Sequence, residues 1–142
     1  MGRLLIYPKL CIGCKACEIA CAREHNGINN IEVYVMDEAR ISIPYTCLHC
    51  TNPLCVTKCP VNALNKSSDV VLIDHSKCTK CLECVKICPY NSIKVIDKLG
   101  LITKCDLCYH RLLKNLPPAC ASTCPTGAIT YIEVNMEKES FH

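Results

Sequence analysis

Residues 78–90 read CTKCLECVKICPY, and the spacing of their four cysteines decides the fold. Three cysteines, each separated by two residues, can bind three corners of a four-iron, four-sulfur cubane. The fourth cysteine, three residues further on, points away and serves a second cluster. Pro89 then ends the helical turn and redirects the chain. The stretch therefore predicts paired [4Fe-4S] clusters and argues strongly against a zinc site.

The same arrangement recurs along the chain. The sixteen cysteines form four groups: Cys11, Cys14, Cys17 and Cys21; Cys47, Cys50, Cys55 and Cys59; Cys78, Cys81, Cys84 and Cys88; Cys105, Cys108, Cys120 and Cys124. Proline follows the last cysteine of groups two, three and four, and a similar phrase comes next: VNAL, YNSI or TGAI. In group one, Ala22 stands where proline is expected. The β-rich stretches VVLIDHSKC and AITYIEV predict short strands that return the polypeptide over the clusters.

The composition also points to a metal protein. Of 142 residues, 16 are cysteine, one is phenylalanine and none is tryptophan. This cysteine content exceeds the roughly 8–10% that marks a cysteine-dependent class, and little large apolar volume is left for a core. The N-terminus, MGRLLIYPKLC, shows no signal-peptide pattern, which disfavours a disulfide framework and favours a cytoplasmic protein. Export with a signal-bearing partner stays open.

Neither membrane insertion nor nucleic-acid binding is expected. No apolar run approaches the roughly 18 residues that a membrane span requires. The formal net charge is +3. Cluster ligands are thiolates, so each oxidised cluster with its ligands carries about −2, and four clusters shift the total to about −5. The basic residues are therefore interpreted as local counter-charges, not as a phosphate-binding surface.

Several basic and imidazole side chains lie within or beside the motifs. Lysine and arginine there could raise local reduction potentials or contact an acidic partner, but solvated surface positions are favoured for most of Lys15, Lys80, Lys86, Lys104 and Arg111. Sixteen cysteines already fill four clusters, so hydrogen bonding or a surface position is favoured over cluster ligation for His25, His49, His75 and His110.

Groups two and four depart from the regular spacing. Group two, CLHCTNPLCVTKCP, has a four-residue spacer that still lets three thiolates converge. Group four, KCDLCYHRLLKNLPPACASTCP at residues 104–125, has an 11-residue spacer that by itself also suits zinc. Its TGAI ending repeats the endings of groups two and three. A fourth cluster is the simpler interpretation, and one zinc beside three clusters is the alternative.

In the order of its four motifs the chain resembles the four-cluster ferredoxin-like electron-transfer subunits of molybdenum and tungsten oxidoreductases. These include the iron-sulfur subunits of dimethyl sulfoxide reductase, formate dehydrogenase, hydrogenlyase and aldehyde ferredoxin oxidoreductase complexes. The bare spacing also allows groups one and two, and three and four, to pair. The resemblance implies instead four ligand sets: Cys11, Cys14, Cys17 and Cys124; Cys47, Cys50, Cys55 and Cys88; Cys78, Cys81, Cys84 and Cys59; Cys105, Cys108, Cys120 and Cys21.

The expected fold class is α+β, with two fused bacterial-ferredoxin-like units, one inserted into the other, small and loop-rich. Residues 47–100 would form the inserted unit, and residues 1–46 plus 101–142 the outer unit, with two clusters in each. The strand RLLIY would pair near AITYIEV. The clusters would replace the missing apolar core.

The sequence shows no catalytic machinery of its own. It contains no dinucleotide fingerprint, no phosphate-binding loop and no convincing nucleophile with a base. The resemblance implies an electron-transfer subunit that connects the active site of a large catalytic partner to a soluble electron carrier or a further redox subunit. A molybdopterin- or tungstopterin-dependent partner is favoured. The alternatives are a free-standing polyferredoxin, or a subunit of a hydrogenase or carbon monoxide dehydrogenase system.

Overall fold

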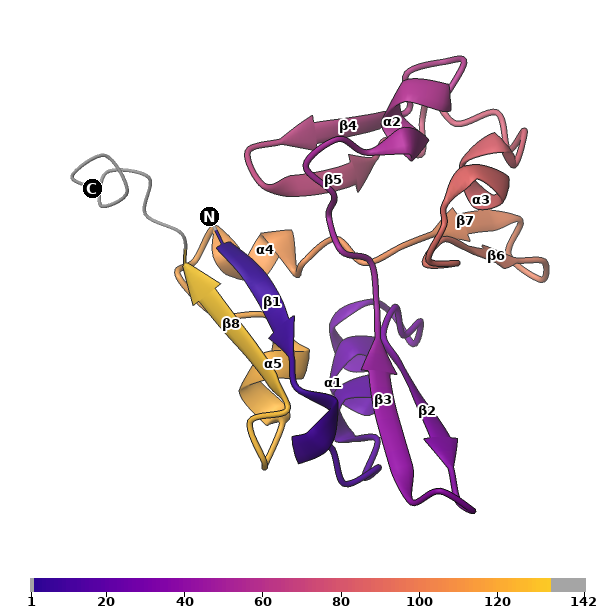
Figure 1. The fold of residues 1–142 in the computed structure, drawn as a ribbon. Helices are drawn as coiled ribbons and strands as arrows, with labels where there is room; N and C mark the ends of the chain where they lie inside the picture. The colour runs from indigo at the N-terminus through magenta and orange to yellow at the C-terminus, as the bar shows by residue number, and fades with distance from the viewer. Residues whose placement is uncertain (1, 134–142) are drawn as a thin grey trace. The chain divides into compact units, whose positions relative to one another are not determined.

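The structure, a computed structural model, describes residues 2–133 and divides the chain into two compact units (Figure 1). Unit 1 contains Met1–Tyr45 and Leu107–His142, and unit 2 contains Thr46–Asp106. The ends of the expected outer unit, residue 1 and residues 134–142, lie outside the described residues. Short strands, short helices and long loops confirm a small, loop-rich chain of mixed α and β structure.

Unit 1 is closed by its first and last strands. Its described elements are β1 (Gly2–Ile6), η1 (Pro8–Leu10), α1 (Ala16–Glu24), β2 (Glu32–Met36), β3 (Ile41–Tyr45), α4 (Tyr109–Leu112), α5 (Ala119–Thr123) and β8 (Ile129–Glu133). Strands β1 and β8 pair antiparallel, which confirms the expected pairing of RLLIY with AITYIEV. At Gly2 the strands approach so closely that a Cβ would lie 1.7 Å from the Ile132 carbonyl oxygen.

The core of unit 1 is small and contains cysteines. Helix α1 packs against α5, and strands β2 and β3 form an antiparallel hairpin. The buried side chains are Cys17, Cys21, Ile31, Val33, Cys120 and Ile129. Half of these six residues are cysteines from the motifs, so the core of this unit is built around the predicted cluster ligands.

Unit 2 is made of two hairpins and two short helices. It contains α2 (Leu54–Lys58), β4 (Leu64–Ser67), β5 (Val70–Ile73), α3 (Glu83–Ile87), β6 (Lys94–Ile96) and β7 (Leu101–Thr103). Its core consists of Leu64, Val71, Cys84, Ile93 and Ile102. The expected boundary after residue 100 falls at the turn between β6 and β7, and because these strands pair with each other, unit 2 extends to Asp106.

Proline explains where three of the helices end. Helices α2, α3 and α5 stop at the residue before the last cysteine of their groups, and proline follows each of these cysteines. The ψ angles are 116° at Cys59, 114° at Cys88 and 115° at Cys124. A residue that precedes proline is sterically excluded from the helical region. Group one has Ala22 in this place, and helix α1 continues past Cys21 to Glu24.

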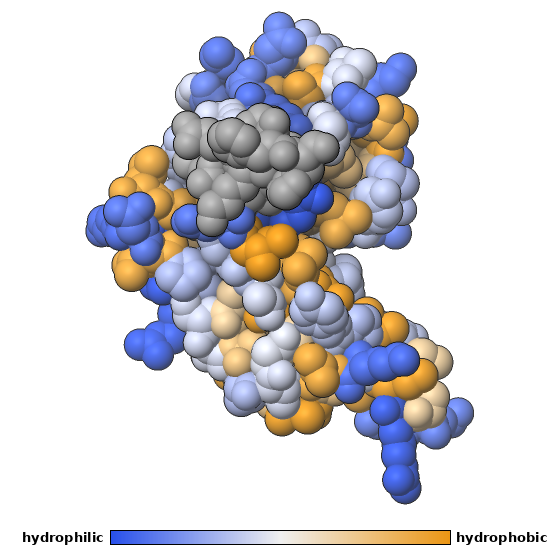
Figure 2. Space-filling model, turned by 60° about the vertical axis from the view of Figure 1, so that its left-hand side comes forward, coloured by the Kyte–Doolittle hydropathy of each residue, from blue (hydrophilic) through white to orange (hydrophobic). Residues whose placement is uncertain are grey.

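Much apolar surface remains outside the cores. On the face drawn in Figure 2, orange apolar residues lie between blue hydrophilic ones. Exposed examples are Ile12, Ile19, Tyr34, Leu99 and Leu113. Among residues 2–133, none of the helices has the length and apolar character that crossing a membrane requires. Side-chain packing alone therefore accounts for a small part of what holds this chain together.

Candidate metal centres

The four C-x2-C segments share one backbone feature. The residue just before the second cysteine of each group has a positive φ angle: 72° at Gly13, 47° at His49, 59° at Lys80 and 57° at Leu107. This left-handed conformation costs a non-glycine residue about 1–2 kcal/mol, so its surroundings must maintain it. Such turns direct successive backbone N–H groups toward an anion. All four groups thus have a turn that is typical of sites that bind an anion.

A second repeated feature surrounds the last cysteine. In groups two, three and four, the residue three positions after it again has a positive φ angle: 55° at Asn62, 50° at Asn91 and 74° at Gly127. Asparagine and glycine tolerate this conformation best, which explains the phrases VNAL, YNSI and TGAI. The turn brings backbone amides onto the sulfur, because the Ala63 N–H donates to Cys59 Sγ at 3.2 Å.

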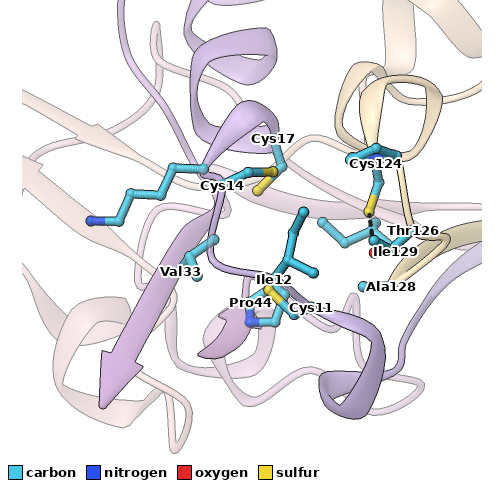
Figure 3. Close-up of a pocket in the computed structure, with 12 residues that line it drawn as sticks. Cys11, Ile12, Cys14, Cys17, Val33, Pro44, Cys124, Thr126, Ala128 and Ile129 are labelled. Carbon is cyan, nitrogen blue, oxygen red and sulfur yellow. Dashed lines mark hydrogen bonds between the residues drawn. The ribbon is translucent and has the colours of Figure 1, made fainter. Parts of the chain in front are cut away.

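Cysteines from both ends of the chain meet at one hollow in unit 1. In Figure 3, Cys11, Cys14 and Cys17 come from the segment around the start of α1, and Cys124 faces them from the segment after α5. The hollow spans about 300 Å³, including space that is open to solvent. Its other walls are mostly apolar and include Ile12, Val33, Pro44, Ala128 and Ile129. Cys14 is exposed, so one edge of the hollow faces solvent.

Unit 2 has two similar hollows. One spans about 310 Å³, including space that is open to solvent, and its lining includes Cys47, Cys50, Cys55 and Cys88. The other spans about 350 Å³, again including open space, and its lining includes Cys59, Cys78, Cys81 and Cys84. In each, three cysteines of one group meet the last cysteine of the other group. Four thiols around a hollow with mostly apolar walls and nearby backbone N–H donors are a donor set that fits a [4Fe-4S] cluster.

The remaining four cysteines are divided between the units. Cys21, Cys108 and Cys120 are buried in unit 1, whereas Cys105 belongs to unit 2. Backbone N–H groups donate to two of these sulfurs, from Asn30 to Cys21 Sγ at 3.2 Å and from Ala119 to Cys108 Sγ at 3.5 Å. This set stays a prediction of the sequence. None of the sixteen cysteines, all of which lie within the described residues, forms a disulfide.

The environment of a thiol depends on its place in the group. Burial raises the pKa of the third cysteine in groups one to three, to about 11 at Cys17 and upward at Cys55 and Cys84. At Cys59 and Cys124, burial also raises the pKa, but backbone N–H donors outweigh burial and the pKa is lowered. A thiol with a raised pKa keeps its proton at neutral pH unless a metal cation displaces it. The buried thiols are therefore expected to lose their protons when iron binds.

The basic residues beside the motifs divide into two kinds. Lys15, Lys80 and Lys86 are exposed, as expected, and Arg111 donates to Glu24 Oε1 at 3.0 Å. Lys104 is the exception to the solvated positions expected for most of these residues, because it is only 5% exposed. A strand's side chains alternate between its two faces, and Ile102 is also buried, so continuing that alternation beyond β7 would have predicted a buried Lys104.

Of the four histidines that lie near the motifs, three make hydrogen bonds, and hydrogen bonding or a surface position was expected for all four. His25 Nδ1 lies 2.8 Å from the Cys21 carbonyl oxygen, and His110 Nε2 lies 2.8 Å from Glu24 Oε2. The Val71 N–H donates to His49 Nδ1 at 3.0 Å. His75 is exposed. What the sequence did not indicate is that Val71, a buried apolar residue, holds both His49 and Lys104 through its backbone.

Residues 38–134 match the family described as the 4Fe-4S dicluster domain, and residues 8–24 match the 4Fe-4S binding domain. A tetrathionate reductase subunit of Salmonella typhimurium is 34% identical over 88% of this chain and 55% of its own length. A polysulfide reductase chain of Wolinella succinogenes is 32% identical over 94% of this chain and 76% of its own. An anaerobic dimethyl sulfoxide reductase chain of Escherichia coli is 30% identical, with 85% and 68% covered.

These comparisons agree with the resemblance stated from the motifs, including the dimethyl sulfoxide reductase type. The chain spans about half the length of the tetrathionate reductase subunits that it matches. The two matched segments together contain all sixteen cysteines. Group one lies in the shorter segment, and groups two to four lie in the longer one.

Proposed function

Because the protein belongs to the family of 4Fe-4S dicluster proteins, we propose that it is an electron-transfer subunit carrying four [4Fe-4S] clusters. The single observation that carries this proposal is the meeting of four cysteines, three local and one distant, at each of three separate hollows. A [4Fe-4S] cluster accepts and gives up single electrons, and its potential depends on burial and on hydrogen bonds to sulfur.

Three ligand sets are supported by the hollows. Cluster 1 would be bound by Cys11, Cys14, Cys17 and Cys124, cluster 2 by Cys47, Cys50, Cys55 and Cys88, and cluster 3 by Cys78, Cys81, Cys84 and Cys59. The protein itself supplies apolar walls that exclude water and backbone N–H groups that stabilise negative charge on sulfur. Cys14 and Cys81 are exposed, so electrons could enter and leave through the solvent-facing edges of clusters 1 and 3.

We propose a fourth cluster bound by Cys105, Cys108, Cys120 and Cys21. One repeated feature supports it over zinc. Leu107 has a positive φ angle, as do Gly13, His49 and Lys80 at the same place in the other three groups. A segment that repeats this feature of three predicted cluster loops is expected to bind the same kind of group. On this proposal each unit is ferredoxin-like, with the segment around residues 47–100 inserted between the two halves of the other.

The chemistry of substrate conversion belongs to a partner subunit. The relatives named as reductase chains and subunits are parts of larger reductases. We propose that this chain connects a large catalytic subunit, of the molybdopterin or tungstopterin type, to a soluble electron carrier or a further redox subunit. The chain would hold its clusters at fixed positions between these two redox partners and would take no part in bond formation or cleavage.

Iron and acid-labile sulfide per chain, measured after anaerobic purification, test the cluster number. Four cubanes predict about 16 iron and 16 sulfide. About 12 of each with one zinc would contradict the fourth cluster, and a colourless protein that holds only zinc would contradict the whole proposal.

The partner is tested separately, by affinity purification of the tagged chain from its native cells. A large co-purifying subunit with a stoichiometric amount of molybdenum or tungsten is expected. A monomer without either metal that passes electrons to several unrelated enzymes would contradict the subunit proposal and favour a free polyferredoxin.

A further inference from the structure

Lys104 is a buried cation on the wall of a predicted cluster site. Its side chain is 5% exposed and lines the same hollow as Cys47, Cys50, Cys55 and Cys88. The ammonium donates to the Val71 carbonyl oxygen at 2.5 Å and to the Cys105 carbonyl oxygen at 2.6 Å. Both hydrogen bonds fix the charge in place, so it cannot swing out to solvent as a surface lysine does.

The acceptors of this ammonium are neutral. Two carbonyl oxygens satisfy its hydrogen bonds but contribute no formal negative charge, and a buried charge without an opposite charge is costly. Thiolates around the shared hollow would place negative charge beside it, because Lys104 lines the same hollow as the four cysteines. Lys104 and Cys55 line the same hollow, so the positive field of the ammonium reaches a predicted ligand.

His49 does not carry a second positive charge at this site. Its Nδ1 accepts the Val71 N–H at 3.0 Å, and an imidazolium has no free acceptor nitrogen. Val71 therefore holds a neutral imidazole through its N–H and a charged ammonium through its carbonyl. Of these two groups, only the ammonium adds a full positive charge beside the predicted cluster.

Reduction adds one electron, and hence one unit of negative charge, to a cluster without making or breaking a covalent bond. We propose that Lys104 raises the reduction potential of the cluster bound by Cys47, Cys50, Cys55 and Cys88, because its buried ammonium stabilises that added charge. The inference rests on the proposed ligand set. It assigns Lys104 a role in positioning charge beside a cluster and no role as a ligand.

Lys66 provides a matched control. It lies directly opposite Val71 in the β4–β5 hairpin, and its ammonium donates to the Thr51 carbonyl oxygen at 3.0 Å, within the loop of group two. It therefore carries the same charge into the same region of unit 2, but its side chain is exposed. Water reduces the interaction of an exposed charge several-fold relative to a buried one. Removal of its charge should leave every cluster potential unchanged.

The test is a redox titration of the full-length chain, followed by electron paramagnetic resonance, in Lys104→Gln, Lys104→Met, Lys104→Arg and Lys66→Gln. Dithionite supplies the electrons. Either neutral variant of Lys104 that retains wild-type iron should lower one midpoint potential. A tenfold change in the ratio of oxidised to reduced cluster at fixed potential, about 59 mV for one electron, is the expected scale. Lys104→Arg keeps the charge and should match the wild type, as should Lys66→Gln.

Several outcomes would overturn the proposal. One is a neutral Lys104 variant with full iron content and unchanged midpoints, and another is an equal shift in Lys66→Gln. Loss of the cluster in both neutral variants but not in Lys104→Arg would make the role structural and would also overturn it. The shifted signal must be the one that Cys55→Ser abolishes. If the wild type shows no signal that depends on Cys55, the proposed ligand set itself fails, which is a different result from an unshifted potential.

Discussion

The Arg111 guanidinium donates to Glu24 Oε1 at 3.0 Å and joins two segments that are 87 residues apart in the sequence. Glu24 is the last residue of α1, the helix that carries Cys17 and Cys21. Arg111 lies in the 11-residue spacer of group four and also donates to the Pro117 carbonyl oxygen at 2.8 Å. The long spacer is therefore a folded loop, and the ion pair between Arg111 and Glu24 links it to helix α1.

Removal of this contact should weaken iron binding at group four. A half-buried ion pair with additional hydrogen bonds contributes more than an exposed one. We expect Glu24→Ala to release part of its iron to a chelator several-fold faster than the wild type, because Arg111 and His110 both lose their partner. Glu83→Ala is the control, since its contact with Lys86 is longer, at 3.9 Å, and more exposed. Equal release rates in the two variants would show that the contact with Glu24 has no positioning role.

Replacement of Cys124 should remove the cluster of the opposite chain end. We expect Cys124→Ser to abolish the same paramagnetic signal as Cys14→Ser and to lower the iron content from about 16 to about 12 per chain. Thr126→Val is the control, because the Thr126 hydroxyl lies 3.8 Å from Cys124 Sγ and is not a proposed ligand. Loss of the signal that depends on Cys81 would mean that the groups pair differently.

The turn after Cys124 should tolerate asparagine better than alanine. Gly127 has a φ angle of 74°, and a Cβ built there meets no atom within 4 Å, so the cost of a side chain is conformational only. Gly127→Ala should cost about 1 kcal/mol in the free energy of unfolding, and Gly127→Asn less, because Asn62 and Asn91 hold the same conformation.

Thermal unfolding of the cluster-loaded protein under anaerobic conditions measures the stability of Gly127→Ala and Gly127→Asn. Gly13→Ala should be the most damaging of the three, since its Cβ would lie 2.8 Å from Ser42 Oγ in addition to the backbone strain at φ 72°. Equal costs for alanine and asparagine at position 127 would mean that the backbone conformation there does not matter.

Iron removal should unfold the chain. The two cores consist of a few aliphatic side chains and of cysteines that are proposed ligands, so little packing remains when the clusters are lost. We expect treatment with a chelator and an oxidant to abolish most of the β-sheet signal in far-ultraviolet circular dichroism, and reconstitution with iron and sulfide to restore it. An iron-free protein with a near-native spectrum and a cooperative thermal transition would contradict this prediction.

Much of the local structure could be predicted from the sequence because it depends on neighbouring residues. Proline after the last cysteine predicted where α2, α3 and α5 end, and the absence of proline after Cys21 accounts for the longer α1. The β-rich stretches predicted β5 and β8. The cysteine spacing indicated the kind of metal site, and the motif order indicated the family. Except for the order of the motifs, each of these inferences concerns residues that lie close together in the sequence.

The sequence by itself determined what each segment can bind, since the spacing of thiols and the turn residues Asn62, Asn91 and Gly127 are local properties. Only the tertiary structure decided which distant cysteine shares a hollow with which three. The spacing fits two pairings equally, and closure of β1 against β8 brings Cys124 to the hollow of Cys11. The structure also decided that Lys104 is buried and Lys86 is not, because a lysine's exposure depends on the elements that fold over it.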